Sequence, residues 1–442
     1  MKTKNKFYAI AMLMIVLFSI SPSAYAQFTF NGQMVDRFEL RHGYGKAIEK
    51  GTDPAAFISQ RIRLEGNYKL NKLTFYVSFQ DVRTWGSTAQ LKITDNLFSL
   101  YEGWAQIHFD SSFSIKVGRQ ELNYDNARFL GNVDWALQGR SHDFALLKYE
   151  KKNTKIDLGG GYNQDAESLT NNIFTNTNQY KTAQMLRIAQ KLGKFDISFL
   201  IWNNGQQFIV RDTAGKVTQK GMRYSQTFGL PTLKFTHKNT TISGFYYHQV
   251  GKDIKNKSLN AFDASLQVSQ VFKFNEAKKN QLRLTAGAEV LSGTATNYTG
   301  SVNQSYSPLF GTNHGFNGYM DMFYVGGRHE NSVGLIDAYL KLRYDFSPAA
   351  FIALNGNAFV AYADVYKGAT KQNKYLGTEL DLAGGYVFNK SVSFQAGYSH
   401  MFGTPTIQNL EKVNTADAVQ NWAYVMLIIR PKSDKKFIGL YN

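Results

Sequence analysis

The sequence predicts an all-β protein, a transmembrane antiparallel β-barrel of about 18 strands with short turns at one end and long loops at the other. Three observations predict this fold. Apolar and polar residues alternate with a period of two through much of the chain, as in strands with one apolar face. The connections between these runs alternate between short and long. The composition, with 33 Phe, 26 Tyr and 37 Gly against 7 Pro, suits long strands with interfacial aromatic girdles.

The first 26 residues have the pattern of a cleaved signal peptide. Three lysines in the first six residues precede an apolar run that ends at Ile20, and Ala24 and Ala26 stand at the key positions of a cleavage site. The alternative is a membrane anchor, but the apolar run is shorter than the roughly 20 residues that a spanning helix needs. Cleavage leaves 416 of the 442 residues and, because three lysines are lost, lowers the formal charge from +17 to +14. We expect a signal peptide over 1–26 and one barrel over 27–442.

The alternation gives approximate strand positions. In residues 61–68, for example, Ile62, Leu64 and Tyr68 share one face, and polar residues share the other. The predicted strands are 28–42, 57–70, 72–85, 99–110, 112–121, 143–151, 154–163, 181–191, 194–203, 222–237, 239–250, 259–274, 279–293, 334–347, 349–364, 375–388, 391–402 and 420–430. Cysteine is absent, so an exported chain of this size must be held by something other than disulfides, such as closed strand pairing.

The connections separate the barrel from other all-β folds. Short turns are predicted at 69–72, 109–112, 151–154, 191–194, 347–350 and 388–391, and long polar segments at 43–56, 86–98, 122–142, 163–180, 203–221, 294–333 and 403–419. Outer-membrane barrels have this asymmetry, with tight periplasmic turns and larger outer loops. A soluble sandwich or propeller is the competing fold. It does not predict the long and short rhythm, and no repeat of blade size is visible.

The motifs of common enzymes are missing from the sequence. It has no nucleophile elbow, no phosphate-binding glycine loop and no histidine pair with metal-ligand spacing. We therefore expect no enzyme activity, no cofactor and no metal. We expect no nucleic-acid partner for this basic chain, because it has an export signal and no basic helix or base-stacking module.

Charge on the polar face of the strands is the main chemical signal. If the apolar face meets lipid, the opposite face lines the lumen. This places six basic residues inside, Arg61, Arg63, Arg187, Arg283, Lys341 and Arg343, with Glu65, Glu289, Asp337, Glu379 and Asp381 as candidate partners. Basic groups in a narrow passage concentrate anions, and guanidinium pairs with carboxylate in a bidentate geometry. Two alternatives remain open: the charges neutralise one another in a structural ladder, or the surplus in turn lysines contacts lipid head groups.

Several linked motifs resemble those of the alginate export family of outer-membrane barrels. Residues 117–149 contain a GRQE strand end, an R-x-x-G-N-x-x-W loop and a G-R-x-x-D strand start. Residues 308–312, leading to 318–321, resemble a second signature loop of the family, and residues 376–381 and 397–403 resemble its last strands. The resemblance covers most of the mature chain. It implies an eighteen-stranded monomeric barrel, with a constriction lined by basic side chains, that conducts alginate outward.

The matched motif also suggests particular residues. Arg119, Arg128 and Arg140 stand within it, so the resemblance implies that they line the conduit or anchor a loop. Asp134 and Trp135 of the same motif have a purely structural alternative, in which they brace a loop folded into the barrel mouth. One feature departs from many outer-membrane barrels, which end on an aromatic residue of the last strand. Here Pro431 and a basic segment follow the predicted last strand, so either the insertion signal is atypical or the last strand lies later.

These observations predict a passive channel for an anionic polysaccharide of the alginate type, in the outer membrane of a Gram-negative bacterium. A general or anion-preferring porin for small solutes is the alternative, because a fold does not fix a substrate. An outer-membrane enzyme or adhesin is a third hypothesis without a supporting motif. The expected partners are outer-membrane lipid, the anionic polysaccharide or another anionic solute, and periplasmic export proteins.

Overall fold

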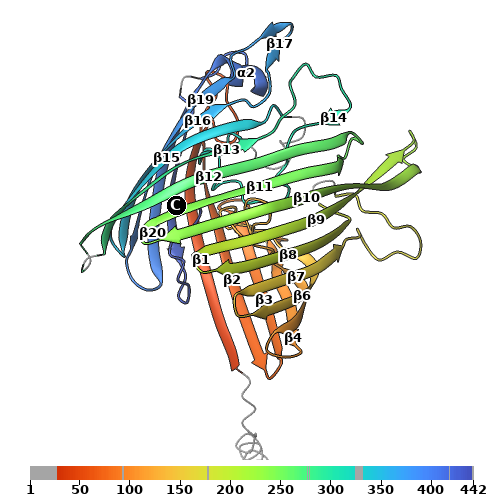
Figure 1. The fold of residues 1–442 in the computed structure, drawn as a ribbon, viewed down its shortest axis with the longest axis vertical. Coiled ribbons are helices and arrows are strands. Elements are labelled where there is room, and N and C mark those ends of the chain that lie inside the picture. The colour runs from red at the N-terminus through yellow and green to blue at the C-terminus, as the bar shows by residue number, and fades with distance from the viewer. Residues whose placement is uncertain are drawn as a thin grey trace, which may run out of the picture.

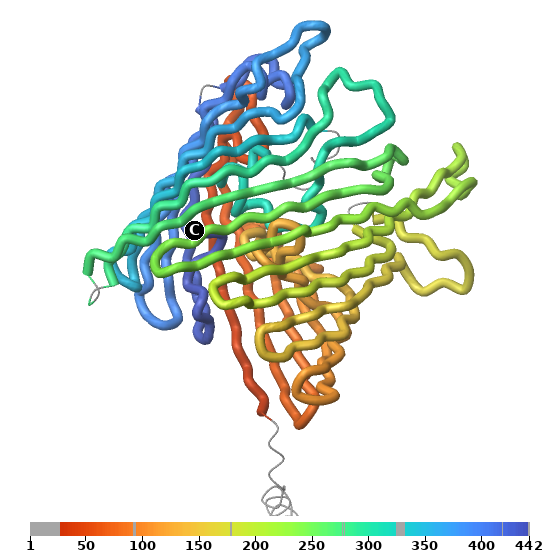
Figure 2. Tube along the Cα trace, in the orientation of Figure 1, coloured from red at the N-terminus to blue at the C-terminus, as the bar shows by residue number. Residues whose placement is uncertain are grey.

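The computed structural model describes residues 27–91, 94–176, 179–275, 277, 279–323, 332–417 and 419–440. The expected signal peptide lies outside these residues. Within them, eighteen strands form one closed antiparallel barrel (Figures 1 and 2). The barrel closes where β1 (Gln27–His42) pairs with β21 (Asn421–Ile429), from Met34 opposite Ile429 to His42 opposite Asn421.

Each of the eighteen predicted strands is present, and β21 is the last strand of the described barrel. The other sixteen barrel strands are β2 (Ala55–Leu70), β3 (Leu73–Thr84), β4 (Phe98–His108), β5 (Phe113–Gln120), β6 (His142–Lys151), β7 (Thr154–Tyr162), β8 (Thr182–Leu192), β9 (Phe195–Arg211), β10 (Val217–His237), β11 (Thr240–Lys252), β12 (Ser258–Asn275), β13 (Asn280–Leu291), β15 (Leu335–Ser347), β16 (Ala350–Val360), β19 (Tyr375–Val387) and β20 (Val392–Gly403).

The two faces of the barrel wall differ as the alternation predicted. On β16, Ile352 and Leu354 are 44% and 46% exposed, whereas Asn355 and Asn357 are 1% and 3% exposed. Successive side chains of a strand point to opposite faces, so the apolar row points outward and the polar row points into the lumen. A wall in contact with lipid hydrocarbon needs apolar side chains on its outer face and paired backbone polar groups. The outward apolar row meets the first requirement, and the closed strand pairing meets the second.

Short turns gather at one end of the barrel. The start of β1 and the end of β21 lie at this end as well, where Gln27 pairs with Lys69 and Val392 with Ile429. In outer-membrane barrels the short turns are periplasmic, and we call this the inner end. The opposite, outer end carries the long connections, including residues 121–141 and the segment between β13 and β15.

The prediction of a long loop at residues 203–221 is wrong. β9 continues to Arg211 and β10 begins at Val217, so the two strands form an extended hairpin that projects beyond its neighbours (Figure 1). Polar side chains bond within and beside this hairpin, as where Gln226 Nε2 donates to Asn203 Oδ1 at 2.6 Å. A strand beyond the lipid needs no apolar face, so the polar composition of this segment did not indicate its structure.

The remaining elements are short. β14 (Val302–Asn303) pairs in parallel with β12, β17 (Tyr366–Lys367) pairs with β18 (Thr370–Lys371), and α2 (Pro405–Glu411) lies in the connection after β20. The sequence analysis did not predict them, because two to seven residues are too few to show a period. None of the helices in the described ranges is long and apolar enough to span a membrane.

Candidate functional site

Two outer-end connections fold into the lumen and pair with each other. The first inward loop comprises residues 121–141, and the second comprises the described parts of 292–334. Leu130 and Phe310 form a parallel β-bridge, and Gly131 N donates to Phe310 O at 2.9 Å. A Cβ atom on Gly131 would lie 2.3 Å from Thr312 Oγ1, and one on Gly311 would lie 2.0 Å from the carbonyl oxygen of Arg128. The close approach therefore requires glycine in both signature motifs.

Arg128 joins both inward loops to the barrel wall. Its guanidinium is fully buried and lies 2.6 Å from Glu289 Oε1 and 3.2 Å from Asp263 Oδ2. It also donates to Asn317 Oδ1 of the second inward loop at 2.9 Å, and Asn317 Nδ2 donates to Glu289 and Asp337. Burial lowers the pKa of Arg128, but the two carboxylates outweigh burial and raise it above its usual value. Arg128 is therefore a fixed cation that anchors the loops.

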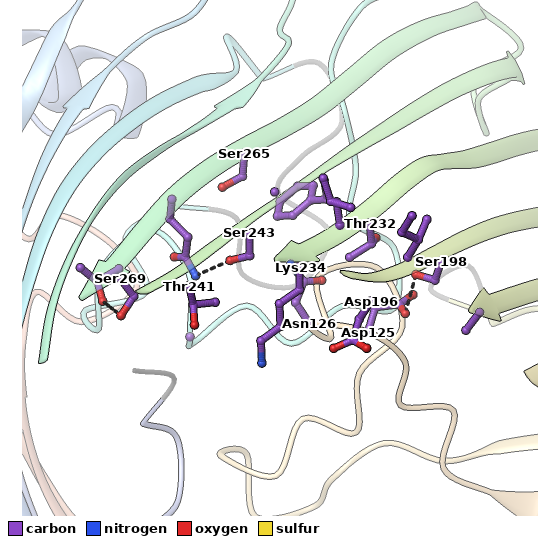
Figure 3. Close-up of a pocket in the computed structure, with 18 of the residues that line it drawn as sticks. Asp125, Asn126, Asp196, Ser198, Thr232, Lys234, Thr241, Ser243, Ser265 and Ser269 are labelled. Atoms are coloured by element: carbon purple, nitrogen blue, oxygen red, sulfur yellow. Dashed lines mark hydrogen bonds between the residues drawn. The ribbon is translucent and has the colours of Figure 1, made fainter. Parts of the chain in front are cut away.

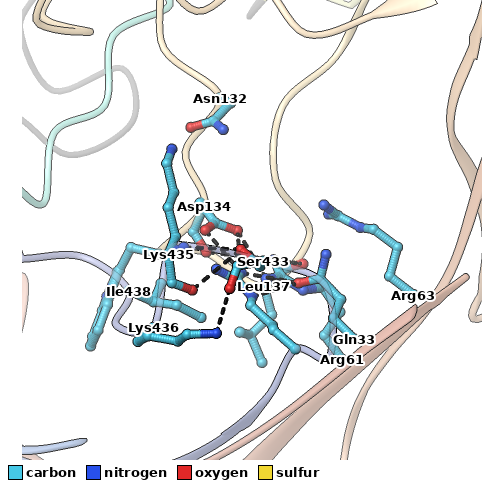
Figure 4. Close-up of polar contacts among 12 residues, drawn as sticks. Gln33, Arg61, Arg63, Asn132, Asp134, Leu137, Ser433, Lys435, Lys436 and Ile438 are labelled. Carbon is cyan, nitrogen blue, oxygen red and sulfur yellow. Dashed lines mark hydrogen bonds and ion pairs between the residues drawn. The ribbon is translucent and has the colours of Figure 1, made fainter. Parts of the chain in front are cut away.

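Asp134 is the corresponding anchor on the opposite wall (Figure 4). Its two carboxylate oxygens lie 2.9 Å from Arg61 Nη2 and 3.0 Å from Arg430 Nη2. Gln33 Oε1 accepts hydrogen bonds from both arginines, at 2.9 and 3.0 Å. Burial alone would raise the pKa of Asp134, but Arg61 and Arg430 hold that pKa well below its ordinary value. Arg61, predicted to face the lumen, does so, and its charge is paired with a loop carboxylate.

Trp135 packs beside this anchor. Its ring stacks on His314 of the second inward loop at 4.0 Å and meets the ring of Tyr424 edge-on at 5.1 Å. The Arg37 guanidinium lies 4.2 Å from the same ring, a cation–π distance. These contacts are those expected of the alternative in which Asp134 and Trp135 brace a loop folded into the barrel.

Three further basic residues of the prediction also have protein partners. Arg63 donates to Gln80 Oε1 at 2.7 Å and lies 3.5 Å from the ring centroid of Tyr101. Arg140 donates to the carbonyl oxygen of Gly311 at 2.9 Å, and burial lowers its pKa to about 10, so it remains cationic at neutral pH. Arg343 binds Asp345 at 2.9 Å. Much of the predicted positive lining therefore binds other residues of the barrel wall and of the inward loops.

Arg119 lies on the other face of the wall. It alternates with the buried Gln120 and shares its face with Val117, which is 49% exposed. Its guanidinium pairs with Asp143 at 2.9 Å, and both side chains are exposed. Only the motif resemblance suggested that Arg119 lines the conduit or anchors a loop, and its position in the strand alternation was not considered. We therefore do not count Arg119 among the residues that line the lumen.

Most of the predicted lumen carboxylates also accept hydrogen bonds from the barrel wall or from the inward loops. Glu65 accepts a hydrogen bond from Gln33 Nε2 at 3.0 Å, and Glu289 and Asp337 bind the Arg128 and Asn317 group described above. Glu379 accepts from the backbone N–H of Met320, in the second inward loop, at 2.8 Å. Asp381 is buried two residues further along β19. The acids therefore lie inside as predicted, but the chief arginine partners of this wall come from loops.

Beneath the inward loops lies a cavity of about 820 Å³ (Figure 3). Three of the predicted basic residues, Arg187, Arg283 and Lys341, line it, together with Lys234 and three lysines at the inner end, Lys152, Lys155 and Lys191. Arg187 is paired with Asp125 at 2.6 Å, whereas Lys341 forms no ion pair with any described residue. The sequence analysis missed Lys234, although it shares a strand face with Thr232 and the alternation would have placed both inside.

Like charges and hydroxyl groups distinguish this cavity. Arg283 lies directly opposite Arg343 in the β13–β15 register, and Lys341 lies one inward position further along β15. Like charges in directly opposed positions destabilise a sheet, and Asp345, which pairs with Arg343, lies two residues further along the same strand. The adjoining strands β10, β11 and β12 carry hydroxyl side chains along the same cavity, among them Thr232, Ser243, Ser265 and Ser269. Within the described ranges, no group of three or more acidic or histidine side chains is placed to hold a metal ion.

The depressed pKa of Asp134 predicts a pH dependence. A carboxyl with a lowered folded-state pKa contributes its full stability above the ordinary carboxyl pKa of about 4 and loses it as the pH falls through the folded value. We therefore expect Asp134→Asn to be less stable to urea than the parent at pH 7. The difference should shrink as the pH falls below about 4. A difference that stayed constant down to pH 2 would contradict the ionic role of Asp134.

The closed barrel, its apolar outer face and its inward loops define the class of the protein: it is an outer-membrane β-barrel channel. Three solved structures share the fold. OccAB4 of Acinetobacter baumannii is 10% identical over 92% of this chain and 99% of its own, with a TM-score of 0.58. OpdQ and OccK5 (OpdH) of Pseudomonas aeruginosa, 10% and 11% identical, each cover 91% of this chain and 98% of their own, with TM-scores of 0.56.

The family follows from the sequence itself. The family model for alginate export matches residues 26–420, so the chain belongs to the alginate export family. A comparison with curated proteins gave no match. Family and fold are those of outer-membrane channels rather than enzymes.

Proposed function

We propose that this protein is a passive channel through which an anionic polysaccharide of the alginate type crosses the outer membrane. The basic lining of the cavity carries the proposal, because Arg283 of β13 and Lys341 of β15 line it together with Lys234 of β10. Uronate carboxylates along a polymer would meet these cations in turn. Many weak contacts of this kind lower the entry barrier and still permit release.

The hydroxyl-bearing wall supports the same ligand class. A polysaccharide presents hydroxyl groups as well as carboxylates, and Ser and Thr side chains both donate and accept hydrogen bonds. Periplasmic export proteins would meet the inner end, where turn lysines border the cavity.

Planar-bilayer recording of the purified barrel tests this proposal. The reversal potential in a KCl gradient measures the ion preference, and the loss of current on adding oligosaccharides measures the block. We expect anion preference in KCl and a concentration-dependent block by oligouronates, with little block by neutral oligosaccharides of equal length. Arg283→Gln combined with Lys341→Gln should weaken both the preference and the block, because two cavity cations are lost. Arg119→Gln is the matched control, because Arg119 faces away from the lumen.

A general or anion-preferring porin for small solutes is the second candidate. It is favoured by the number of lumen cations already paired with protein carboxylates, as Arg61, Arg128 and Arg187 are. A barrel that prefers chloride but responds equally to charged and neutral oligosaccharides would support this porin and contradict the polysaccharide channel.

A further inference from the structure

The chain turns back into the lumen after the last strand. β21 ends at Ile429, and residues 431–440, here called the inner segment, follow it at the inner end. Ile438 is only 1% exposed, and Leu440 packs against the buried core. The matched family region stops at residue 420, so this segment lies beyond it.

The inner segment has a specific seat on the lumen wall. Ile438 N donates to Gln395 Oε1 at 3.0 Å, and Gln395 Nε2 donates to Ile438 O at 2.9 Å. The Phe437 ring meets Phe351 edge-on at 4.7 Å. Gln395 and Phe351 are buried residues of β20 and β16 whose strand neighbours point outward. The segment therefore lies inside the barrel and not across its rim.

The segment also reaches the first inward loop. A Cβ atom on Gly439 would lie 2.2 Å from Trp135 Cε3, so the backbone of the segment rests directly on the indole ring. Arg430, just before the segment, binds Asp134 of the same loop. The segment entering from the inner end thus meets the loop entering from the outer end, and Figure 4 draws Asp134 and Leu137 of the loop together with Lys435 and Ile438 of the segment.

The barrel wall behind this contact has an apolar inward face. The inward positions of β21 are Trp422, Tyr424, Met426 and Ile428, and all are at most 3% exposed. The lumen face of a water-filled barrel is ordinarily polar. An apolar inward stripe is stable only when other apolar groups cover it, and Ile438 and Leu440 belong to the same buried cluster.

The charge of the segment makes its seat sensitive to anions. It carries Lys432, Lys435 and Lys436 against the one acid Asp434. Among the described residues these lysines form no ion pair, and Lys432 and Lys436 donate only to backbone carbonyl groups. The segment has no regular secondary structure.

We propose that the inner segment is an autoinhibitory plug, which obstructs the inner entrance and leaves its seat when a polyanion binds its lysines. The anion-driven release rests on the proposed function, whereas the obstruction does not. Release would expose the Gln395 and Phe351 seat and open a path beside the first inward loop.

Single-channel conductance in KCl tests the obstruction. Deletion of residues 431–442 should raise the conductance severalfold, with the barrel still showing heat-modifiable mobility on a gel. Phe437→Ser with Ile438→Ser keeps the chain length and should raise the conductance or produce brief openings. Phe388→Ser, on the exposed inner turn, is the matched control. A folded deletion variant and a folded double variant that both conduct like the parent would overturn the plug.

Cysteine labelling tests the release. The chain has no cysteine, so Ile438→Cys supplies a single buried thiol, and Lys72→Cys supplies an exposed control on the turn between β2 and β3 at the same end. A membrane-impermeant maleimide should modify Cys at 438 slowly, and oligouronates should accelerate this reaction without affecting the control. A raised conductance with an unchanged labelling rate would overturn the anion-driven release. An unplugged barrel without preference for uronates would contradict the proposed function and leave the obstruction standing.

Discussion

Replacing Arg128 with glutamine is expected to lower the free energy of unfolding by about 3–5 kcal/mol, because removal of one partner leaves buried charges uncompensated. Asp263 and Glu289 would face each other without the guanidinium that lies between them. Asn317 would lose its contact with the first inward loop as well. Both loops should then lose their anchor to β12 and β13, and the single-channel conductance should increase and fluctuate.

Urea denaturation with linear extrapolation measures the first effect, and planar-bilayer recording measures the second. Arg119→Gln removes an exposed ion pair and is the control, with an expected change below about 1 kcal/mol. Adding Glu289→Gln to Arg128→Gln should restore part of the lost stability, because one of the buried charges is removed. A stable Arg128→Gln variant with parental conductance would contradict the anchoring role.

Trp135→Ala is expected to have the second large effect. Truncation of a buried tryptophan costs about 3–5 kcal/mol, and this ring joins the first inward loop to His314, Tyr424 and the inner segment. The loss should loosen both inward loops together. We expect lower stability to urea and a higher conductance than in the parent.

Two controls separate this effect from a general loss of aromatic area. Trp135→Phe should be intermediate, because a smaller ring still fills part of the site. Trp85→Ala should be nearly neutral, because Trp85 is 55% exposed. Equal effects of Trp135→Ala and Trp85→Ala would show that Trp135 does not join the loops.

The fold could be predicted from the sequence because lipid imposes a strict period on the wall. A residue such as Leu354 must be apolar and its neighbour Asn355 need not be, so each strand is visible in the sequence. The rule stops at the edge of the lipid. The β9–β10 hairpin continues as strand through residues 203–211 and 217–221 without that pattern, and the alternation could not reveal it.

The site could be predicted only in part. Alternation placed Arg61, Glu289 and Lys341 on the lumen face, where the structure has them. It could not give the partners of Arg61 and Glu289, since Asp134, Asn317 and Arg128 reach them from loops whose path has no period. For Arg119 the prediction itself was at fault. The motif suggested that its side chain faces the lumen, whereas the strand alternation would have placed that side chain on the outer face of the barrel. The inner segment followed the predicted last strand in sequence, but its packing depends on tertiary contacts alone.

Flux through the purified barrel in proteoliposomes tests most directly whether it is a channel for anionic polysaccharide. Uronate oligomers and neutral oligosaccharides of equal length would be loaded inside, and their release would be followed with parental protein and with Arg283→Gln combined with Lys341→Gln. We predict faster release of the uronates from parental vesicles and a loss of that advantage in the double variant. Equal release of both sugars by the parental protein would contradict the proposal.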